Sequence, residues 1–501
     1  MKRQLSTKRQ LFVLVLSLFI SVTSIEAQWT QVGADIDGVA ALNYLGNAIS
    51  LSTDGSILAV GVGDSDANGT DSGQVRVYKY NSGTWTQIGD DINGEAGDKL
   101  GTSISINSDG SIIVAGAPYN DANGNNSGQV RIYKNNSGTW TQIGSINGEV
   151  AEEYSGISVD INSDGSIVVI GASGNAETET DAGQVRIYKN NSGTWTQIGD
   201  DINGKFGFEN SGSSVSISSD GTIVAIGAPF NDGTAYDFNV DADYGAVRIY
   251  KNNSGTWTQI GDDINGNVEI GFFGISVSLN TDGSMIAIGA SGAGVNDTFP
   301  GMVYVFKNTS GTWTQIGDAI EGESRDYAGY SVSLSSDGTI VAIGAPHANL
   351  NSNGQARVYK NDSGTWTRMG TYTDIDGEAA GDLSGSSVSL SSDGYTVAIG
   401  APYNDGNGSN SGQVRVFKYN PVNISELKEA GISIYPNPST GVFNIKSAKD
   451  YEITITDITG KVIYHHTAAT VNEQIYLQQS GVYIINFKSQ TKNFSSKIIV
   501  K

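Results

Sequence analysis

Seven tryptophans recur along the chain at nearly even intervals, and this repeat constrains the fold more than any other feature. Each stands in a near-copy of the phrase Trp-Thr-Gln-Ile-Gly, as at residues 85–89, and neighbouring copies lie 53 to 62 residues apart. They are Trp29, Trp85, Trp140, Trp195, Trp257, Trp313 and Trp366. Self-similarity at such a period, in units composed of strands, is typical of β-propeller blades.

One repeat contains four predicted strands, which we call a, b, c and d in chain order. In the second repeat, strand a is residues 102–107, where Ser and Ile alternate, and Asp109-Gly110 forms the hairpin turn after it. Strand b, residues 111–117, is almost continuously apolar, as expected of a strand buried on both faces. Strand c is residues 129–134, and the tryptophan phrase that follows is strand d.

The two ends of the repeat region predict how the fold closes. Residues 29–33 form a strand d with no earlier strand to pair with, and residues 413–418 form a strand c that no tryptophan phrase follows. We therefore expect the first strand to complete the last blade, which also satisfies edge hydrogen bonds. The expected fold class is all-β, with a seven-bladed β-propeller over residues 28–419.

Strands a to c resemble the FG-GAP repeats of integrin α-type propellers and their bacterial relatives. The FG element stands as Phe273-Gly274 and, more loosely, as Leu45-Gly46, Leu100-Gly101 and Ala328-Gly329. The GAP element stands as Gly116-Ala117-Pro118, Gly227-Ala228-Pro229, Gly344-Ala345-Pro346 and Gly400-Ala401-Pro402, with variants at residues 171–173, 289–291 and 61–63. Calcium-binding members carry an Asp-x-Asp-x-Asp-Gly loop between strands a and b. Here that turn is only Asp-Gly, too short to surround an ion that takes six to eight oxygens, so the resemblance implies no calcium at these turns.

The first 27 residues are typical of an export signal. Lys2, Arg3, Lys8 and Arg9 precede an apolar run at residues 11–20, and a small residue, Ala27, stands before the expected cleavage site. The alternative is an uncleaved anchor, but the run is shorter than the ~20 residues that a spanning helix needs. No other segment is apolar enough, so we expect a protein that does not span the membrane.

Charge and cysteine content exclude several partners. The formal net charge is −23, which repels phosphate backbones and anionic lipids and argues against nucleic-acid binding. The chain has no cysteine, so disulfides, thiol catalysis and thiolate metal sites are excluded.

After a linker at residues 420–430, residues 431–501 form a separate β-rich unit with its own motifs. It contains Tyr435-Pro436-Asn437-Pro438, Asp457-Ile458-Thr459-Gly460-Lys461-Val462 and Ser480-Gly481-Val482-Tyr483 in that order. This unit resembles the type A sorting domain of the type IX secretion system of Bacteroidetes. The resemblance implies a small Ig-like β-sandwich that engages the secretion machinery, with the protein then released or attached to the outer-membrane surface. The strand pattern alone also allows a generic Ig-like or carbohydrate-binding sandwich.

No catalytic constellation emerges from the sequence. The three histidines are His347, His465 and His466, and none recurs beside a nucleophile, which gives a Ser-His-Asp arrangement little support. A pair of loop carboxylates acting as a glycosidase stays open. We expect a binding or adhesion protein and not an enzyme; the alternatives are a secreted polysaccharide hydrolase and a structural surface or matrix protein.

The recurring arginines and tryptophans are interpreted as structural. An arginine occupies one strand-c position in six repeats, and Tyr304 replaces it in the fifth. The arginines are Arg76, Arg131, Arg186, Arg248, Arg357 and Arg415. We expect ion pairs from these side chains in preference to an anion-binding ring, and packing anchors from the tryptophans in preference to stacking platforms.

The ligand, a glycan or a protein, is expected on the side that carries the b–c and d–a loops. These loops vary between repeats, whereas the a–b and c–d turns are short and uniform, and binding residues favour variable loops on a rigid scaffold. Seven rings are the candidate contacts: Tyr119, Phe230, Tyr236, Phe238, Phe299, His347 and Tyr403. The alternative for each ring is that it only packs one loop against another.

One loop is also a candidate cation site, with calcium as the ion. Asp237, Asn239, Asp241 and Asp243 place oxygen ligands at alternate positions. Asp64, Asp66 and Asn68 form a similar but less complete set in the first repeat. The alternative is a solvated acidic loop with Asx turns.

Overall fold

A computed structural model describes residues 28–232, 243–292, 300–349, 351–370, 374–420, 431–457, 461–468, 471–489 and 493–501. Each regular element within these ranges is a β-strand. Among these residues there is no helix long and apolar enough to cross a membrane. Contacts divide the chain into a larger unit, Gln28–Asn420, and a smaller unit that ends at Lys501.

The described strands of the larger unit form seven antiparallel sheets, and in each sheet strands a, b, c and d lie side by side in that order. We number the sheets 1 to 7 by their strand a. Strands a are β3 (Ala48–Leu51), β8 (Ser103–Ile106), β12 (Ser158–Ile161), β17 (Ser214–Ile217), β22 (Phe273–Leu279), β27 (Ser331–Leu334) and β32 (Ser387–Leu390). Strands b are β4 (Ile57–Val62), β9 (Ile112–Ala117), β13 (Ile167–Ala172), β18 (Ile223–Ala228), β23 (Met285–Ala290), β28 (Ile340–Ala345) and β33 (Thr396–Ala401).

The outer strands follow the same pattern. Strands c are β5 (Gln74–Asn81), β10 (Gln129–Asn136), β14 (Gln184–Asn191), β19 (Ala246–Asn253), β24 (Met302–Thr309), β29 (Gln355–Asp362) and β34 (Gln413–Asn420). Strands d are β6 (Thr84–Gln87), β11 (Thr139–Asn147), β15 (Thr194–Gln197), β20 (Thr256–Gln259), β25 (Thr312–Gln315), β30 (Thr365–Arg368) and, for sheet 7, β1 (Gln28–Gln31). The four strands expected of each repeat are therefore present.

Beyond strand d the chain pairs with strand c a second time, which the sequence did not predict. The added strands are β2 (Ile36–Asp37), β7 (Ile92–Asn93), β16 (Ile202–Asn203), β21 (Ile264–Asn265), β26 (Ile320–Glu321) and β31 (Ile375–Asp376). The first pairing with strand c is interrupted at the glycine of the tryptophan phrase. In sheet 1 this glycine is Gly89, whose φ is +74°. Sheet 2 has one residue fewer between this glycine and the next isoleucine, and there β11 continues to Asn147 with only a bulge.

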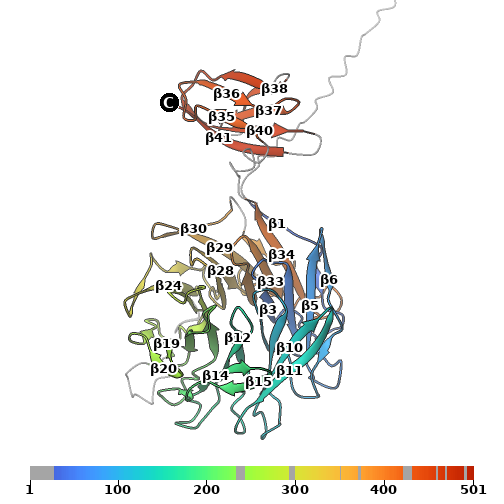
Figure 1. Cartoon of the computed structure of the whole chain (residues 1–501), viewed down its shortest axis with the longest axis vertical. Coiled ribbons are helices and arrows are strands. Elements are labelled where there is room, and N and C mark those ends of the chain that lie inside the picture. The colour runs from blue at the N-terminus through green and yellow to red at the C-terminus, as the bar shows by residue number, and fades with distance from the viewer. Residues whose placement is uncertain are drawn as a thin grey trace, which may run out of the picture. The chain divides into compact units, whose positions relative to one another are not determined.

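The first strand closes the ring of sheets, as predicted. β1 pairs antiparallel with β34, with Trp29 opposite Tyr419, and the two lie together in Figure 1. At the ends of strands a, one backbone N–H of each sheet donates to a carbonyl of the next sheet, and the series returns to its start. It runs Thr53 to Ser108, Ser163, Ser219, Thr281, Ser336, Ser392 and back to Thr53. These hydrogen bonds link all seven sheets into a closed cycle.

The hydrophobic core lies between neighbouring sheets. Between sheets 1 and 2, for example, Val75 and Val77 of β5 pack with Ile104 of β8 and Ile113 of β9. The tryptophans pack against these cores: the Trp85 indole N–H donates to the carbonyl of Val32, 2.9 Å away, the residue that directly follows the preceding strand d. Equivalent bonds are made by Trp29, Trp140, Trp257, Trp313 and Trp366. The prediction that the tryptophans are packing anchors is confirmed.

The described strands of the smaller unit form two antiparallel sheets. One contains β35 (Ser433–Tyr435), β36 (Val442–Lys446) and β39 (Asn472–Tyr476). The other contains β38 (Val462–Thr467), β37 (Glu452–Asp457), β40 (Gly481–Lys488) and β41 (Asn493–Val500). Residues of both sheets, among them Phe443, Ile455 and Phe487, share one buried core, which gives this unit its own source of stability.

Candidate functional site

The order of the antiparallel strands gives the larger unit two unlike sides. We call the side with the a–b and c–d turns the turn face, and the side with the b–c and d–a loops the loop face. On the turn face the turns are closed by their own side chains: Asp109 accepts hydrogen bonds from Ser111, and Asn135 accepts one from the Gly138 N–H. The hydrogen bond from the Ser111 side chain is the main reason that the pKa of Asp109 lies below its usual value.

Four of the candidate rings occupy one equivalent position on the loop face. Tyr119, Phe230, His347 and Tyr403 each follow directly after the Gly-Ala-Pro element at the end of a strand b. The residues Tyr119, Phe230 and Tyr403 are 38%, 38% and 43% exposed. Sequence reasoning selected these residues one by one, and the structure brings them to the same level of four different sheets.

Each of these rings contacts a second ring that the sequence reasoning missed. The pairs, with the distances between ring centroids, are Tyr119–Tyr154 at 5.6 Å, Phe230–Phe272 at 5.3 Å, Tyr403–Tyr44 at 5.1 Å and His347–Tyr327 at 4.7 Å. We call these four pairs the aromatic collar. Tyr44, Tyr154, Phe272 and Tyr327 all stand two residues before the glycine that opens a strand a, and all have positive φ. Their common offset from that glycine is the sequence signal that could have revealed them.

The rings of the collar pack loops against one another and also expose aromatic surface to solvent. The three exposed rings of sheets 2, 4 and 7 each cross to the following sheet, so they tie neighbouring sheets together. Because strands a and b lie nearest the axis of the ring, the collar lies around that axis on the loop face. Burial lowers the pKa of His347, which favours its neutral imidazole.

Most of the remaining site predictions fall on residues whose structure is not described. Tyr236, Phe238, Phe299, Asp237, Asn239 and Asp241 lie outside the described ranges. Asp243 is described, and its N–H donates to Asp232. In the first repeat Asp64 pairs with Lys99, and Asp66 accepts a hydrogen bond from the Asp71 N–H within the same loop. Within the described ranges, no group of three His, Asp or Glu side chains is placed to hold a metal ion.

Beneath the loop face lies a layer of buried ion pairs. In sheet 4, Arg248 contacts Glu209 at 2.6 Å and Asp263 at 2.9 Å. Arg76, Arg131, Arg186, Arg357 and Arg415 also pair with carboxylates. In sheet 5, where Tyr304 replaces the arginine, Gly271 and Ala319 stand where sheet 4 has Glu209 and Asp263. The carboxylates are absent where the arginine is absent, so the structural interpretation of the arginines is confirmed.

A pocket of about 690 Å³ opens on the loop side of sheet 2. Its wall combines polar groups with one exposed ring: Arg131, Gln142, Asn93, Glu95, Asp98 and Tyr119 are among its lining residues. Arg131 is buried and donates to Asp98 at 2.6 Å and to Gln129. This pocket therefore places a buried cation, amides and an aromatic face within reach of a bound molecule, a combination that suits a sugar or a polar peptide segment.

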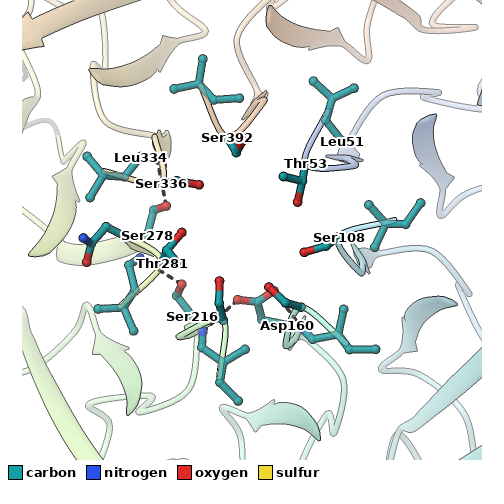
Figure 2. Close-up of a pocket in the computed structure, with 18 residues that line it drawn as sticks. Leu51, Thr53, Ser108, Asp160, Ser216, Ser278, Thr281, Leu334, Ser336 and Ser392 are labelled. Atoms are coloured by element: carbon teal, nitrogen blue, oxygen red, sulfur yellow. Dashed lines mark hydrogen bonds between the residues drawn. The ribbon is translucent and has the colours of Figure 1, made fainter. Parts of the chain in front are cut away.

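A smaller cavity of about 200 Å³ lies on the axis, toward the turn face. Figure 2 shows hydroxyl groups of Thr53, Ser108, Ser216 and Ser336 around it, with Asp160 as the one labelled carboxylate. Asp160 occupies a position that is serine in the other six repeats. Burial raises its pKa, although the N–H groups of Ile217 and Ile161 and the Ser105 hydroxyl donate to the carboxylate.

We expect Asp160→Ser to stabilise the larger unit near neutral pH, with a rise in unfolding temperature on the order of 2 °C. A raised folded-state pKa means that the charged carboxylate costs stability at high pH, and that this cost vanishes below the ordinary aspartate value of 3.8. The serine keeps the ring of hydrogen bonds, because Ser216 accepts the equivalent N–H of Leu279 in the next sheet. Thermal unfolding of both proteins across the acid range measures the difference, and an advantage that grows as the pH falls would contradict the assignment.

Comparison with protein families confirms both resemblances. Residues 433–501 match the secretion system C-terminal sorting domain, and residues 91–133 and 366–417 match the FG-GAP repeat. No curated protein matches the chain.

The chain thus contains FG-GAP repeats and a C-terminal sorting domain, and the regular elements of its described residues are all β-strands. The sorting domain engages the type IX secretion machinery and indicates export to the cell surface or the extracellular space.

Proposed function

We propose that the larger unit is a seven-bladed β-propeller that binds a glycan at the cell surface or outside the cell, and that it is not an enzyme. The seven sheets and their closed hydrogen-bond cycle support the propeller, and the two sheets around one core support an Ig-like sandwich for the smaller unit. A rigid ring of this kind holds loops in fixed positions, which suits recognition of an extended ligand.

The observation that carries the binding proposal is the aromatic collar. Its exposed rings lie on the side where loops differ between sheets, whereas the turn face repeats the same short turns. Aromatic faces bury the apolar C–H surface of a sugar, and the amides and carboxylates around them can hydrogen-bond its hydroxyl groups. A collar of rings at equal height in several sheets offers repeated contacts to a chain of sugar units.

Several carboxylates near the loop face already have fixed partners, and this supports a binding role over hydrolysis. Asp98, Glu209 and Asp326 are held by buried arginines, and Asp121 and Asp405 accept backbone N–H groups of their own loops. Glycosidases instead keep one carboxylate free as a nucleophile or base and one protonated as an acid. Carboxylates with fixed partners are better suited to shaping loops.

The test is glycan binding by the mature protein on an array of surface polysaccharides, followed by calorimetry. Tyr119→Ala combined with Tyr403→Ala should weaken binding about tenfold or more, which corresponds to about 1.4 kcal/mol. Tyr395→Ala is the matched control, because Tyr395 stacks on Tyr419 beside an a–b turn, on the turn face. Equal losses in the two proteins, or sugar turnover by the wild type, would contradict the proposal.

A further inference from the structure

Sheet 2 lacks one side chain that its neighbours share. In most sheets an aspartate stands directly before the added strand, opposite the arginine of strand c. Arg76 is opposite Asp91 in sheet 1, and Arg248 is opposite Asp263 in sheet 4. In sheet 2 the residue paired with Arg131 is Ser145. Among the described strand-c arginines, Arg131 is the one that faces a serine.

In sheets 1 and 4 the aspartate at this position has two donors. In sheet 1, Asp91 accepts from Arg76 Nε at 3.2 Å and from the side-chain amide of Gln87 at 2.7 Å. In sheet 4, Asp263 accepts from Arg248 Nε at 2.9 Å and from the Gln259 amide at 2.7 Å. The glutamine belongs to the tryptophan phrase, and in sheets 1, 2 and 4 it pairs with the tyrosine two residues after the arginine.

Sheet 2 keeps both donors. Arg131 and Gln142, the equivalent of Gln87, both line the 690 Å³ pocket. With no aspartate opposite, Arg131 Nε donates instead to Gln129 in its own strand. Gln74, Gln355 and Gln413 occupy the position of Gln129 in other sheets. Their side-chain oxygens are buried and have no hydrogen-bond partner within the described structure, so none of them accepts from the arginine as Gln129 does in sheet 2.

We propose that this pocket binds the carboxylate of an acidic sugar, with Arg131 and Gln142 as the donors that sheets 1 and 4 give to their own aspartate. The inference rests on the proposed function and specifies its ligand as a glycan that contains uronic acid units. The exposed ring of Tyr119 and the Asn93 amide line the same pocket, and they serve the apolar face and the hydroxyl groups of the sugar ring. These groups favour a sugar over an acidic peptide.

The acidity of the chain does not prevent this binding. Charges on the surface are screened beyond about 8 Å at physiological ionic strength. Of the three carboxylates that line the pocket beside Arg131, Asp98 is paired with Arg131 and Asp121 accepts the Asn126 N–H, and Glu95 is the third. The fold already places two carboxylates on one such arginine: Arg186 contacts Glu153 and Glu149, and Arg248 contacts Glu209 and Asp263. A ligand carboxylate beside the Arg131–Asp98 pair repeats that arrangement.

Calorimetry of the mature protein with oligogalacturonate, with a neutral galactose oligomer of equal length and with a short polyglutamate peptide tests the inference. The decisive variant is Ser145→Asp. It restores the aspartate of the other sheets, whose carboxylate then occupies the place proposed for the carboxylate of the ligand. Ser145→Ala is the matched control. We expect oligogalacturonate to bind more tightly than the other two probes. Ser145→Asp should weaken its binding at least about tenfold, with Ser145→Ala unchanged and the unfolding temperature of Ser145→Asp not lowered.

Several outcomes overturn the inference. If the neutral oligomer binds as tightly and Ser145→Asp has no effect, the acidic-sugar site is wrong, although glycan binding through the collar stands. If polyglutamate binds as well as oligogalacturonate, the pocket recognises carboxylates of peptides and the sugar assignment fails. If none of the glycans on the array binds, both this inference and the proposed function fail.

Discussion

A chain that lacks residues 28–37 should lose the cooperative unfolding transition of its larger unit. The deletion removes β1 and β2, which both pair with β34 of sheet 7, and it removes Trp29, which is buried and donates to the Met369 carbonyl of sheet 6. Loss of one buried tryptophan side chain alone costs about 3–5 kcal/mol. A typical domain has only about 5–15 kcal/mol of stability, so losing two strands as well should open the ring.

Thermal unfolding followed by circular dichroism measures this effect. The control is a chain that ends at residue 420, because the smaller unit has its own core and its removal leaves the seven sheets intact. An unfolding temperature of the deletion variant within a few degrees of the wild type would show that β1 does not hold the ring closed.

Breaking one buried ion pair should have the second-largest effect. Arg248→Leu leaves Glu209 buried without its cation, and such a change costs about 3–5 kcal/mol. Sheet 5 shows which residues can replace the charged group, because Tyr304, Gly271 and Ala319 occupy the positions of Arg248, Glu209 and Asp263 without any charge. The triple variant Arg248→Tyr, Glu209→Gly and Asp263→Ala should therefore recover at least half of the stability that the single variant loses.

Urea unfolding of the single and triple variants gives the two free energies of unfolding. The comparison separates the cost of an unpaired charge from the value of the pair itself. A triple variant less stable than Arg248→Leu would contradict this expectation. It would mean that the ion pairs contribute net stability to the sheets, more than the uncharged residues of sheet 5 can replace.

The strand pattern was predictable because it is carried by local signals. The apolar run of Ile112–Ala117, the Asp109-Gly110 turn and the tryptophan phrase each indicate their element, and seven copies remove the ambiguity of any one. The second pairing after strand d was missed, because Ile92–Asn93 is too short to show a strand period. Its pairing with β5 depends on the left-handed Gly89, whose conformation the tertiary structure determines.

The candidate site was predictable only in part. The exposed rings after the Gly-Ala-Pro elements could be picked as members of variable loops, but Tyr154 and Phe272 contact them from the next sheet. That contact joins residues whose proximity depends on how sheets pack, which no local pattern encodes. The pocket beside Arg131 was missed for a similar reason: Ser145 is unremarkable until the pairing of β10 and β11 places it opposite the arginine.

Hydrogen–deuterium exchange of the mature protein, with and without a bound glycan, tests the central claim most directly, because it locates the ligand on one side of the ring. The proposed binding predicts slower exchange in the loop-face segments at residues 119–128 and 403–412, and unchanged exchange in the turns at residues 107–112 and 391–396. Protection confined to those turns, or spread equally over both faces, would contradict binding at the collar.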